Sequence, residues 1–222
     1  MDHAREDDTM ANGPTLICVT GPDGAGKTTQ IARIAEAISK RGRKKIVAMT
    51  IWDMLLDPST RGRVAFKSPL ELDSFLEILS PMARMLFLCH CLYEALDLAV
   101  ARKPDVILAN GYWYKYWATE VAHGGDEQAM LDLMKVFPEP ALTFCLDISA
   151  EEAFKRKAKL SGYETGFAPE RTLEAFAAFQ ARARSPLERL AREKQWIRLD
   201  GNEPASSLSE TILSRIEPAE QC

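Results

Sequence analysis

The sequence lacks the marks of several large protein classes. It has no run of about 18 apolar residues, the length that a membrane-spanning helix needs. It has no excess of cations either, since 28 Lys and Arg face 32 Asp and Glu for a net charge of −4. We therefore expect no nucleic-acid partner and no membrane partner. Cysteine is scarce: there are five, an odd number, and Cys18 and Cys145 lie inside apolar, strand-like runs. This usage favours a reducing, cytoplasmic setting over a disulfide framework, and the polar, acidic first residues are unlike a signal peptide.

The rest of the composition is that of an ordinary globular protein. A length of 222 residues with 46% hydrophobic content suits one α/β domain with a real core. No internal repeat or low-complexity segment divides it. We expect a loose tail over residues 1–13, a single domain over 14–217 and a loose end after about residue 216.

One segment carries a specific chemical signal. Residues 21–28 read Gly-Pro-Asp-Gly-Ala-Gly-Lys-Thr and match G-x-x-x-x-G-K-[ST], the phosphate-binding loop, or P-loop. An apolar run precedes it and a helical pattern follows it, which is the context that the motif requires. The backbone N–H groups of such a loop point at phosphates, its Lys reaches the β- and γ-phosphates, and its Thr hydroxyl holds Mg²⁺. The expected ATP-binding residues are Gly21, Asp23, Gly24, Ala25, Gly26, Lys27, Thr28 and Thr29.

Strand-like and helix-like patterns alternate along the whole chain. The pattern predicts strands over 15–20, 45–51, 105–109, 141–146 and 196–199. It predicts helices over 29–40, just after Pro69, and over 81–101, 113–123, 127–136, 151–160, 169–194 and 204–216, with Pro186 a candidate interruption. Such alternation indicates a parallel sheet with helices on both faces, and ligands at the carboxyl ends of the strands.

These motifs together resemble the thymidylate kinases. The loop and its neighbours, 21–30, resemble G-x-D-G-x-G-K-T-T-Q of that family, and looser matches follow at 85–87, 140–147, 179–182 and 198–200. The resemblance implies a P-loop three-layer α/β/α fold with a five-stranded parallel sheet in the order 2-3-1-4-5 and a helical lid. It implies transfer of the γ-phosphoryl of ATP, with Mg²⁺, to thymidine monophosphate (dTMP to dTDP) in nucleotide biosynthesis, often by a homodimer.

The resemblance also places a catalytic lid after the fourth strand. The P-loop contains no arginine, and members of this kind bring a cation from a mobile lid, here about 156–168. Four cations lie at 155–159, just before the glycine-bearing loop 161–166. Arg156 aligns with the lid arginine and is our candidate catalytic residue beside Lys27, since a planar guanidinium clamps phosphate well. A solvated basic helix face remains the alternative.

The acceptor side departs from the family pattern. The third strand ends in Asn110-Gly111 where the family has Asp-Arg, so two charges are missing. Asn110 can still bind Mg²⁺ indirectly, through a hydrogen bond to a metal-bound water. The family's acidic loop residue, here Asp23, and its base-stacking aromatic, here Phe87, are present.

Other side chains are candidates for the vacated acceptor site. Lys115 and Arg61 are the candidate replacement cations, and Tyr112 is a further acceptor candidate. The aromatic run 112–117 builds either a stacking pocket or a dimer interface. Cys89-His90-Cys91 lacks the spacing of a zinc pair.

Three functions fit this pattern. The first is a thymidylate kinase acting on a nucleoside monophosphate. The second is a kinase of the same fold with another small-molecule acceptor, which the missing acceptor-side charges favour. The third is a non-catalytic ATP-binding paralogue, which the intact Lys27–Thr28 pair and the basic lid disfavour.

Overall fold

A five-stranded parallel sheet forms the centre of the protein. The computed structural model describes residues 13–42, 44–53 and 69–219. The strands are β1 (Thr15–Thr20), β2 (Ile46–Met49), β3 (Val106–Asn110), β4 (Leu142–Asp147) and β5 (Ile197–Asp200). Their order is β2-β3-β1-β4-β5, and every neighbouring pair is parallel. The predicted strand order and fold class are therefore confirmed.

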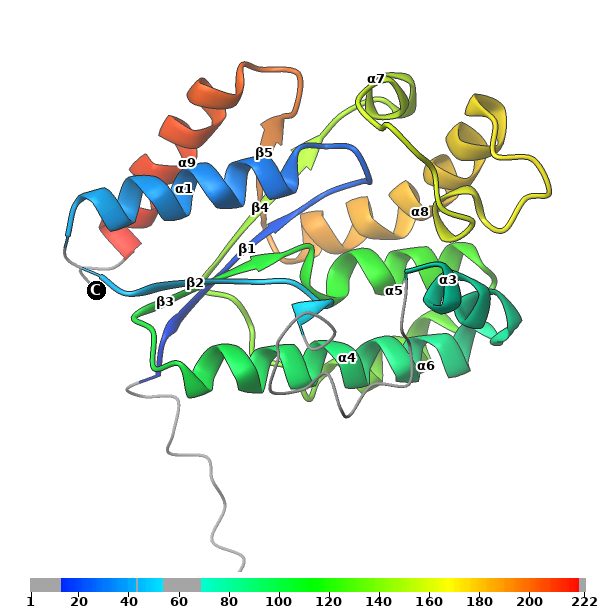
Figure 1. Cartoon of the computed structure of the whole chain (residues 1–222), viewed down its shortest axis with the longest axis horizontal. Helices are drawn as coiled ribbons and strands as arrows, with labels where there is room; N and C mark the ends of the chain where they lie inside the picture. The colour runs from blue at the N-terminus through cyan, green and yellow to red at the C-terminus, as the bar shows by residue number, and fades with distance from the viewer. Residues whose placement is uncertain (1–12, 43, 54–68, 220–222) are drawn as a thin grey trace, which may run out of the picture.

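Helices cover both faces of this sheet (Figure 1). They are α1 (Lys27–Lys40), α3 (Pro69–Ile78), α4 (Pro81–Ala101), α5 (Tyr112–Ala122), α6 (Glu127–Met134), α7 (Ala150–Lys155), α8 (Leu173–Glu193) and α9 (Ala205–Ala219). Successive β1 side chains enter two separate cores, because strand side chains alternate between faces. Ile17 and Val19 join the core with α1 and α9, and Leu16 and Cys18 join the core with α4 and α5. No helix within the described ranges is long and apolar enough to cross a membrane.

The aromatic run of α5 is buried inside the chain's own core. Tyr112, Trp113, Tyr114, Tyr116 and Trp117 are each at most 6% exposed. Both alternatives that we predicted for the run, an open stacking pocket and a dimer interface, are therefore wrong. The physical reason is that α5 lies between α4 and α8, so these helices and the sheet cover it from several sides.

Helix α8 differs from its predicted form at its start and at its proline. It begins at Leu173 rather than at Pro169, because the Thr172 side chain caps it by accepting a hydrogen bond from the Ala175 N–H at 3.2 Å. Pro186 is buried within the helix and does not interrupt it. An interior proline costs about 3 kcal/mol, and the apolar packing of α8 against α5 offsets that cost.

The predicted termini fall mostly outside the described residues. Of the expected tail 1–13, the structure describes residue 13, and α9 continues beyond the predicted end at residue 216 to Ala219.

Candidate functional site

The P-loop connects β1 to α1 and lies against the end of β4 and against α7 (Figure 1). Gly24 shows how close this packing is. Its φ is +83°, a left-handed conformation, and a Cβ atom there would lie 2.5 Å from the Ala153 carbonyl oxygen of α7. Glycine alone fits such a position without strain. The loop therefore holds α7, which leads into the lid, directly beside the phosphate-binding backbone.

Lys27 is buried at the first position of α1. It is 8% exposed, and its Nζ donates to the carbonyl oxygens of Gly21 at 3.0 Å and Pro22 at 2.6 Å. Burial lowers the pKa of Lys27 to about 8, although Asp23 opposes this shift. A partly desolvated ammonium group gains strongly from an anion placed next to it. The site is thus prepared for a phosphate group.

Asp23 and Lys115 form an ion pair at the mouth of the loop. Lys115 Nζ lies 2.5 Å from Asp23 Oδ1, and the two side chains are 17% and 12% exposed. Burial by itself would raise the pKa of Asp23, but Lys115 and Lys27 outweigh it and hold that pKa at about 2. Burial would likewise lower the pKa of Lys115, and Asp23 instead raises it above its usual value. Both groups are therefore charged near neutral pH.

Gly111 lies between the two lysines. A Cβ on Gly111 would lie 3.8 Å from Lys115 Cδ and 3.9 Å from Lys27 Cε. The structure thus brings Lys115 to the place next to Gly111 where the family resemblance implies an arginine. Gly111 has φ +78° and Tyr112 has φ +47°, so the chain turns sharply from β3 into α5. This turn brings the first turn of α5, with Lys115, to the P-loop.

Asn110 reaches the P-loop from the end of β3. Its Nδ2 donates to Thr28 Oγ1 at 3.0 Å. Mg²⁺ in nucleotide sites uses few protein oxygens together with substrate phosphates and water, and the Thr28 hydroxyl beside an amide fits that role. In the part of the chain that the structure describes, no group of three or more His, Cys, Asp and Glu is placed to hold a metal by itself. The site fits a magnesium ion that arrives with a nucleotide.

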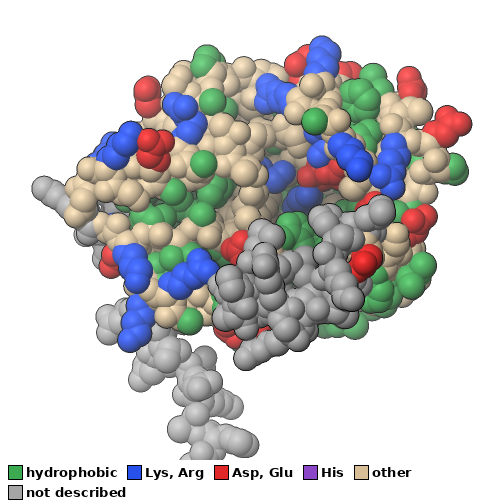
Figure 2. Space-filling model, viewed as in Figure 1, with side chains coloured by type: hydrophobic (Ala, Val, Ile, Leu, Met, Phe, Trp, Pro, Cys, Tyr) green, Lys and Arg blue, Asp and Glu red, His purple; other side chains and the backbone are tan. Residues whose placement is uncertain are grey.

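The lid begins beyond the end of α7, and its two central cations point to different places. Arg156 Nη1 donates to the Gly201 carbonyl oxygen at 3.0 Å, at the turn between β5 and α9. Lys157 Nζ instead lies 2.6 Å from Glu164 Oε1. Lys157 contributes to lowering the pKa of both Asp23 and Lys27. In the space-filling view, basic and acidic side chains gather around a hollow near the middle of this face (Figure 2).

The predicted acceptor residues lie in different surroundings. Phe87 is half-buried on α4, with its ring 5.3 Å from the Phe75 ring at 74°. Tyr112 is fully buried, and its hydroxyl donates to the Pro138 carbonyl oxygen at 2.9 Å, so its ring is part of the core. Arg61 lies outside the described residues.

A buried polar network lies between α4 and α5, and little in the sequence predicts it. Arg84 Nε donates to both oxygens of Glu120 at 2.8 and 2.9 Å, and the Tyr163 hydroxyl donates to Glu120 Oε1 at 2.8 Å. Arg84 and Glu120 are 3% and 0% exposed. The network joins α4, α5 and the short 3-10 helix η2 (Tyr163–Thr165) of the lid. A buried arginine on an apolar helix was its one available signal.

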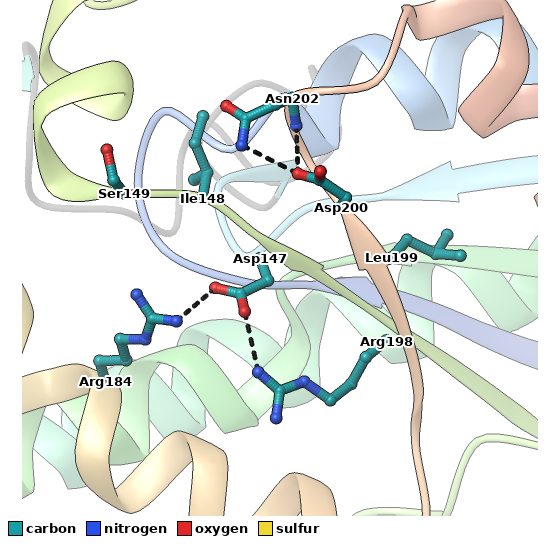
Figure 3. A pocket seen from close by; sticks show the side chains of 8 residues that line it. All are labelled: Asp147, Ile148, Ser149, Arg184, Arg198, Leu199, Asp200 and Asn202. Carbon is teal, nitrogen blue, oxygen red and sulfur yellow. Dashed lines mark hydrogen bonds and ion pairs between the residues drawn. The ribbon is translucent and has the colours of Figure 1, made fainter.

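A second polar hollow lies at the carboxyl ends of β4 and β5. Its volume is about 400 Å³. Figure 3 shows the side chains that line it. Asp147 lies between two arginines there, 2.7 Å from Arg184 Nη2 and 2.8 Å from Arg198 Nη2. Arg184 also pairs with Glu188 at 2.6 Å. Both arginines pair with carboxylates, whereas Lys27 of the P-loop donates to backbone carbonyl oxygens, which makes the P-loop the better phosphate site.

The three residues of the Cys89-His90-Cys91 segment on α4 differ in their exposure. Cys91 is buried, Cys89 is half-buried and His90 is exposed, so the side chains leave α4 in different directions.

Comparison with known proteins gives relatives of one kind, although no family model matches the chain. The chain is 29% identical over 215 residues to a probable thymidylate kinase of Sulfurisphaera tokodaii, across 94% of the chain and 99% of the relative. It is 32% identical over 154 residues to a probable thymidylate kinase of Archaeoglobus fulgidus, across 67% and 74%. It is 25% identical over 221 residues to a thymidylate kinase of Chlorobium chlorochromatii, across 91% and 94%. Similarity of this extent shows that the chain belongs to the thymidylate kinase family.

Proposed function

We propose that the protein transfers the γ-phosphoryl group of ATP to a nucleoside monophosphate, with dTMP as the first candidate acceptor and dTDP as the product. The observation that carries the proposal is the arrangement of lysines around the P-loop. Lys27 is buried in it, Lys115 is ion-paired to its Asp23, and Lys157 approaches it from the lid. Phosphoryl transfer depends on positioning and on neutralising spreading negative charge, and this site offers both.

In the proposed reaction each group has one task. The loop amides and Lys27 bind the β- and γ-phosphates, and the Thr28 hydroxyl would hold Mg²⁺, which neutralises phosphate charge when bound. An oxygen of the acceptor phosphate attacks the γ-phosphorus. A new P–O bond forms, the bond to the β–γ bridging oxygen breaks, and its electron pair stays on ADP. Lys115 holds the acceptor phosphate beside the γ-phosphate.

A second candidate function differs in the acceptor and has its own support. Asn110 and Gly111 carry no charge at positions where the family resemblance implies an aspartate and an arginine. A kinase of the same fold with another phosphorylated small molecule as its acceptor agrees with these features. An intact Lys27 and Thr28 favour either kinase over a non-catalytic paralogue.

A panel assay separates these candidates. ADP release from Mg·ATP is measured with dTMP and with the other common ribo- and deoxyribonucleoside monophosphates, using Lys27→Ala as the inactive control. We expect selective turnover of dTMP. Turnover of another monophosphate in preference to dTMP would reject dTMP and support the second candidate. Absence of turnover throughout, with tight ATP binding, would contradict the proposed reaction.

We also propose that two copies of the chain associate through α4, in the cytoplasm. Leu86, Tyr93 and Val100 recur at every seventh position of this helix and are 51%, 46% and 45% exposed. Apolar residues at this spacing form one stripe along a helix, and such stripes favour contact with another protein surface. The cytoplasmic location has a separate argument, because the buried free thiols of Cys18 and Cys145 suit a reducing compartment. Sedimentation of the wild type against Tyr93→Glu measures the association, and a wild-type monomer at high concentration would refute it.

A further inference from the structure

Lys157 is the one cation of the 155–159 stretch that is largely covered. Its side chain is 17% exposed, whereas Lys155, Arg156 and Lys159 are exposed residues. Helix α7 ends at Lys155, so Lys157 lies in the first turn of chain beyond the helix. Its N–H donates to the Phe154 carbonyl oxygen at 3.0 Å, which holds this turn against α7. The side chain therefore starts from a fixed place beside the P-loop.

Glu164, the partner of Lys157, is also held firmly. One carboxylate oxygen accepts from Lys157 at 2.6 Å, and the other accepts from the Ser161 N–H at 3.0 Å. Its own N–H donates back to Ser161 Oγ at 3.3 Å, and its carbonyl oxygen accepts from Gln180 of α8 at 3.0 Å. A carboxylate held in this way can act as a fixed counter-ion for a mobile ammonium group.

This ion pair faces the P-loop. Gly24 packs against the Ala153 carbonyl of α7, four residues before Lys157. Lys157 and Glu164 also act in opposite directions on the pKa of Lys27, with Lys157 lowering it and Glu164 raising it. Three lysines and two carboxylates thus surround the loop: Lys27, Lys115, Lys157, Asp23 and Glu164. The carboxylates balance two of the three positive charges before a nucleotide arrives.

Arg156 is turned away from this group. Its guanidinium donates to the Gly201 carbonyl oxygen, at the turn between β5 and α9, whereas Lys157 pairs with Glu164. To reach the P-loop, Arg156 would have to break that hydrogen bond and rotate. Lys157 has only to exchange one oxygen anion for another.

We propose that Lys157 is the lid cation that contacts the γ-phosphoryl group during transfer, and that Glu164 is the counter-ion that the phosphate displaces. This proposal rests on the proposed function. Its first test measures turnover and requires that function, whereas its second test measures only nucleotide binding. Lys157 makes and breaks no covalent bond. It stabilises the negative charge that spreads over the γ-phosphate oxygens as the bond to ADP breaks.

The first test compares Lys157→Met with Lys155→Met. Lys155 is the matched control, because it is the same residue type two positions away, exposed and paired with Glu152. We expect Lys157→Met to lower kcat by about 100-fold or more, with only a few-fold change in KM for ATP, as loss of one transition-state contact does. Lys155→Met should stay within about twofold of the wild type. Lys157→Arg should restore most of kcat, because it keeps the cation. A kcat for Lys157→Met within threefold of the wild type would overturn the proposal.

The second test needs no acceptor. The ratio of the Kd values for Mg·ADP and Mg·ATP reports contacts to the γ-phosphate, and Lys157→Met should lower this ratio a few-fold, in line with the small change in KM. Glu164→Gln should bind ATP several-fold more tightly, because no carboxylate then competes for Lys157. An unchanged ratio for Lys157→Met would refute the contact between Lys157 and the γ-phosphate. Weaker ATP binding by a folded Glu164→Gln variant would refute the exchange of Glu164 for the phosphate. If the wild type turned over no monophosphate but Lys157→Met still lost its preference for ATP, the proposed function would fail and the Lys157 contact would stand.

Discussion

The affinity for ATP should fall as the pH rises above neutrality, because the P-loop lysine loses its proton. Burial sets the pKa of Lys27 at about 8. A bound triphosphate favours the charged form and raises that pKa again, so tight binding requires the proton. The free protein then has about half of its Lys27 charged at pH 8 and about a tenth at pH 9. From these fractions, the Kd for ATP should rise about twofold at pH 8 and about tenfold at pH 9, relative to pH 7.

Calorimetry measures this effect in two independent ways. The Kd for Mg·ATP is followed from about pH 7 to 9.5, where the triphosphate itself is fully ionised. Proton uptake is obtained by repeating the titration in buffers of different ionisation enthalpy, and it should approach one proton per ATP at the alkaline end. Neighbouring groups do not interfere, since the pKa of Asp23 is about 2 and that of Lys115 lies above its usual value. Lys27→Met should bind weakly, with no pH dependence.

The stability of the nucleotide-free protein should change in the opposite direction. Between about pH 8 and 10.5 the unfolded chain keeps the Lys27 proton and the folded chain does not, so the free energy of unfolding rises with pH. The rise from this group is at most roughly 3.5 kcal/mol, from about 1.4 kcal/mol per pKa unit. An ATP affinity that stays flat to pH 9.5, without proton uptake, would refute the reasoning that burial controls this lysine.

Three further predictions follow from the same geometry. Lys115→Met leaves the partly buried Asp23 without its partner, so the free energy of unfolding in urea should fall by about 2–3 kcal/mol. Monophosphate binding should weaken about tenfold, and unchanged binding would exclude Lys115 from the acceptor site. Arg84→Met breaks a fully buried ion pair and should cost about 3–5 kcal/mol by the same measurement, and a cost below 1 kcal/mol would contradict the network. Gly24→Ala should weaken ATP binding at least tenfold because of the clash with α7. Gly42→Ala, also at positive φ but with nothing within 4 Å, should cost only about 1 kcal/mol and leave ATP binding intact.

The sheet and the P-loop could be read from the sequence because both depend on local patterns. Apolar strands such as 15–20 and 141–146 differ clearly from helices with a repeat near four residues. The glycine positions of the loop follow from its backbone geometry. The strand order came from the family resemblance, and the structure confirms it.

The remaining features depend on contacts between distant parts of the chain. The burial of Trp113 and Trp117 follows from helices on either side of α5, which no local pattern reveals. The sequence shows Lys157 only as one of four neighbouring cations. Its pairing with Glu164 depends on the loop and on α8, which hold Glu164 in place. The sequence predicts a helix start at Pro169, because proline is common at that position, whereas the structure has Thr172 as the cap.

The turn from β3 into α5 limits how the acceptor site could change in evolution. Gly111 and Tyr112 are two successive residues at positive φ, and such a conformation costs about 1–3 kcal/mol for a residue with a side chain. An arginine at 111 would therefore strain the backbone at the same point where it restored a charge. A lysine one helical turn later supplies a cation to the same space and leaves that backbone untouched. The backbone thus disfavours an arginine at position 111, whereas a substitution at position 115 changes the charge of this space without straining the turn.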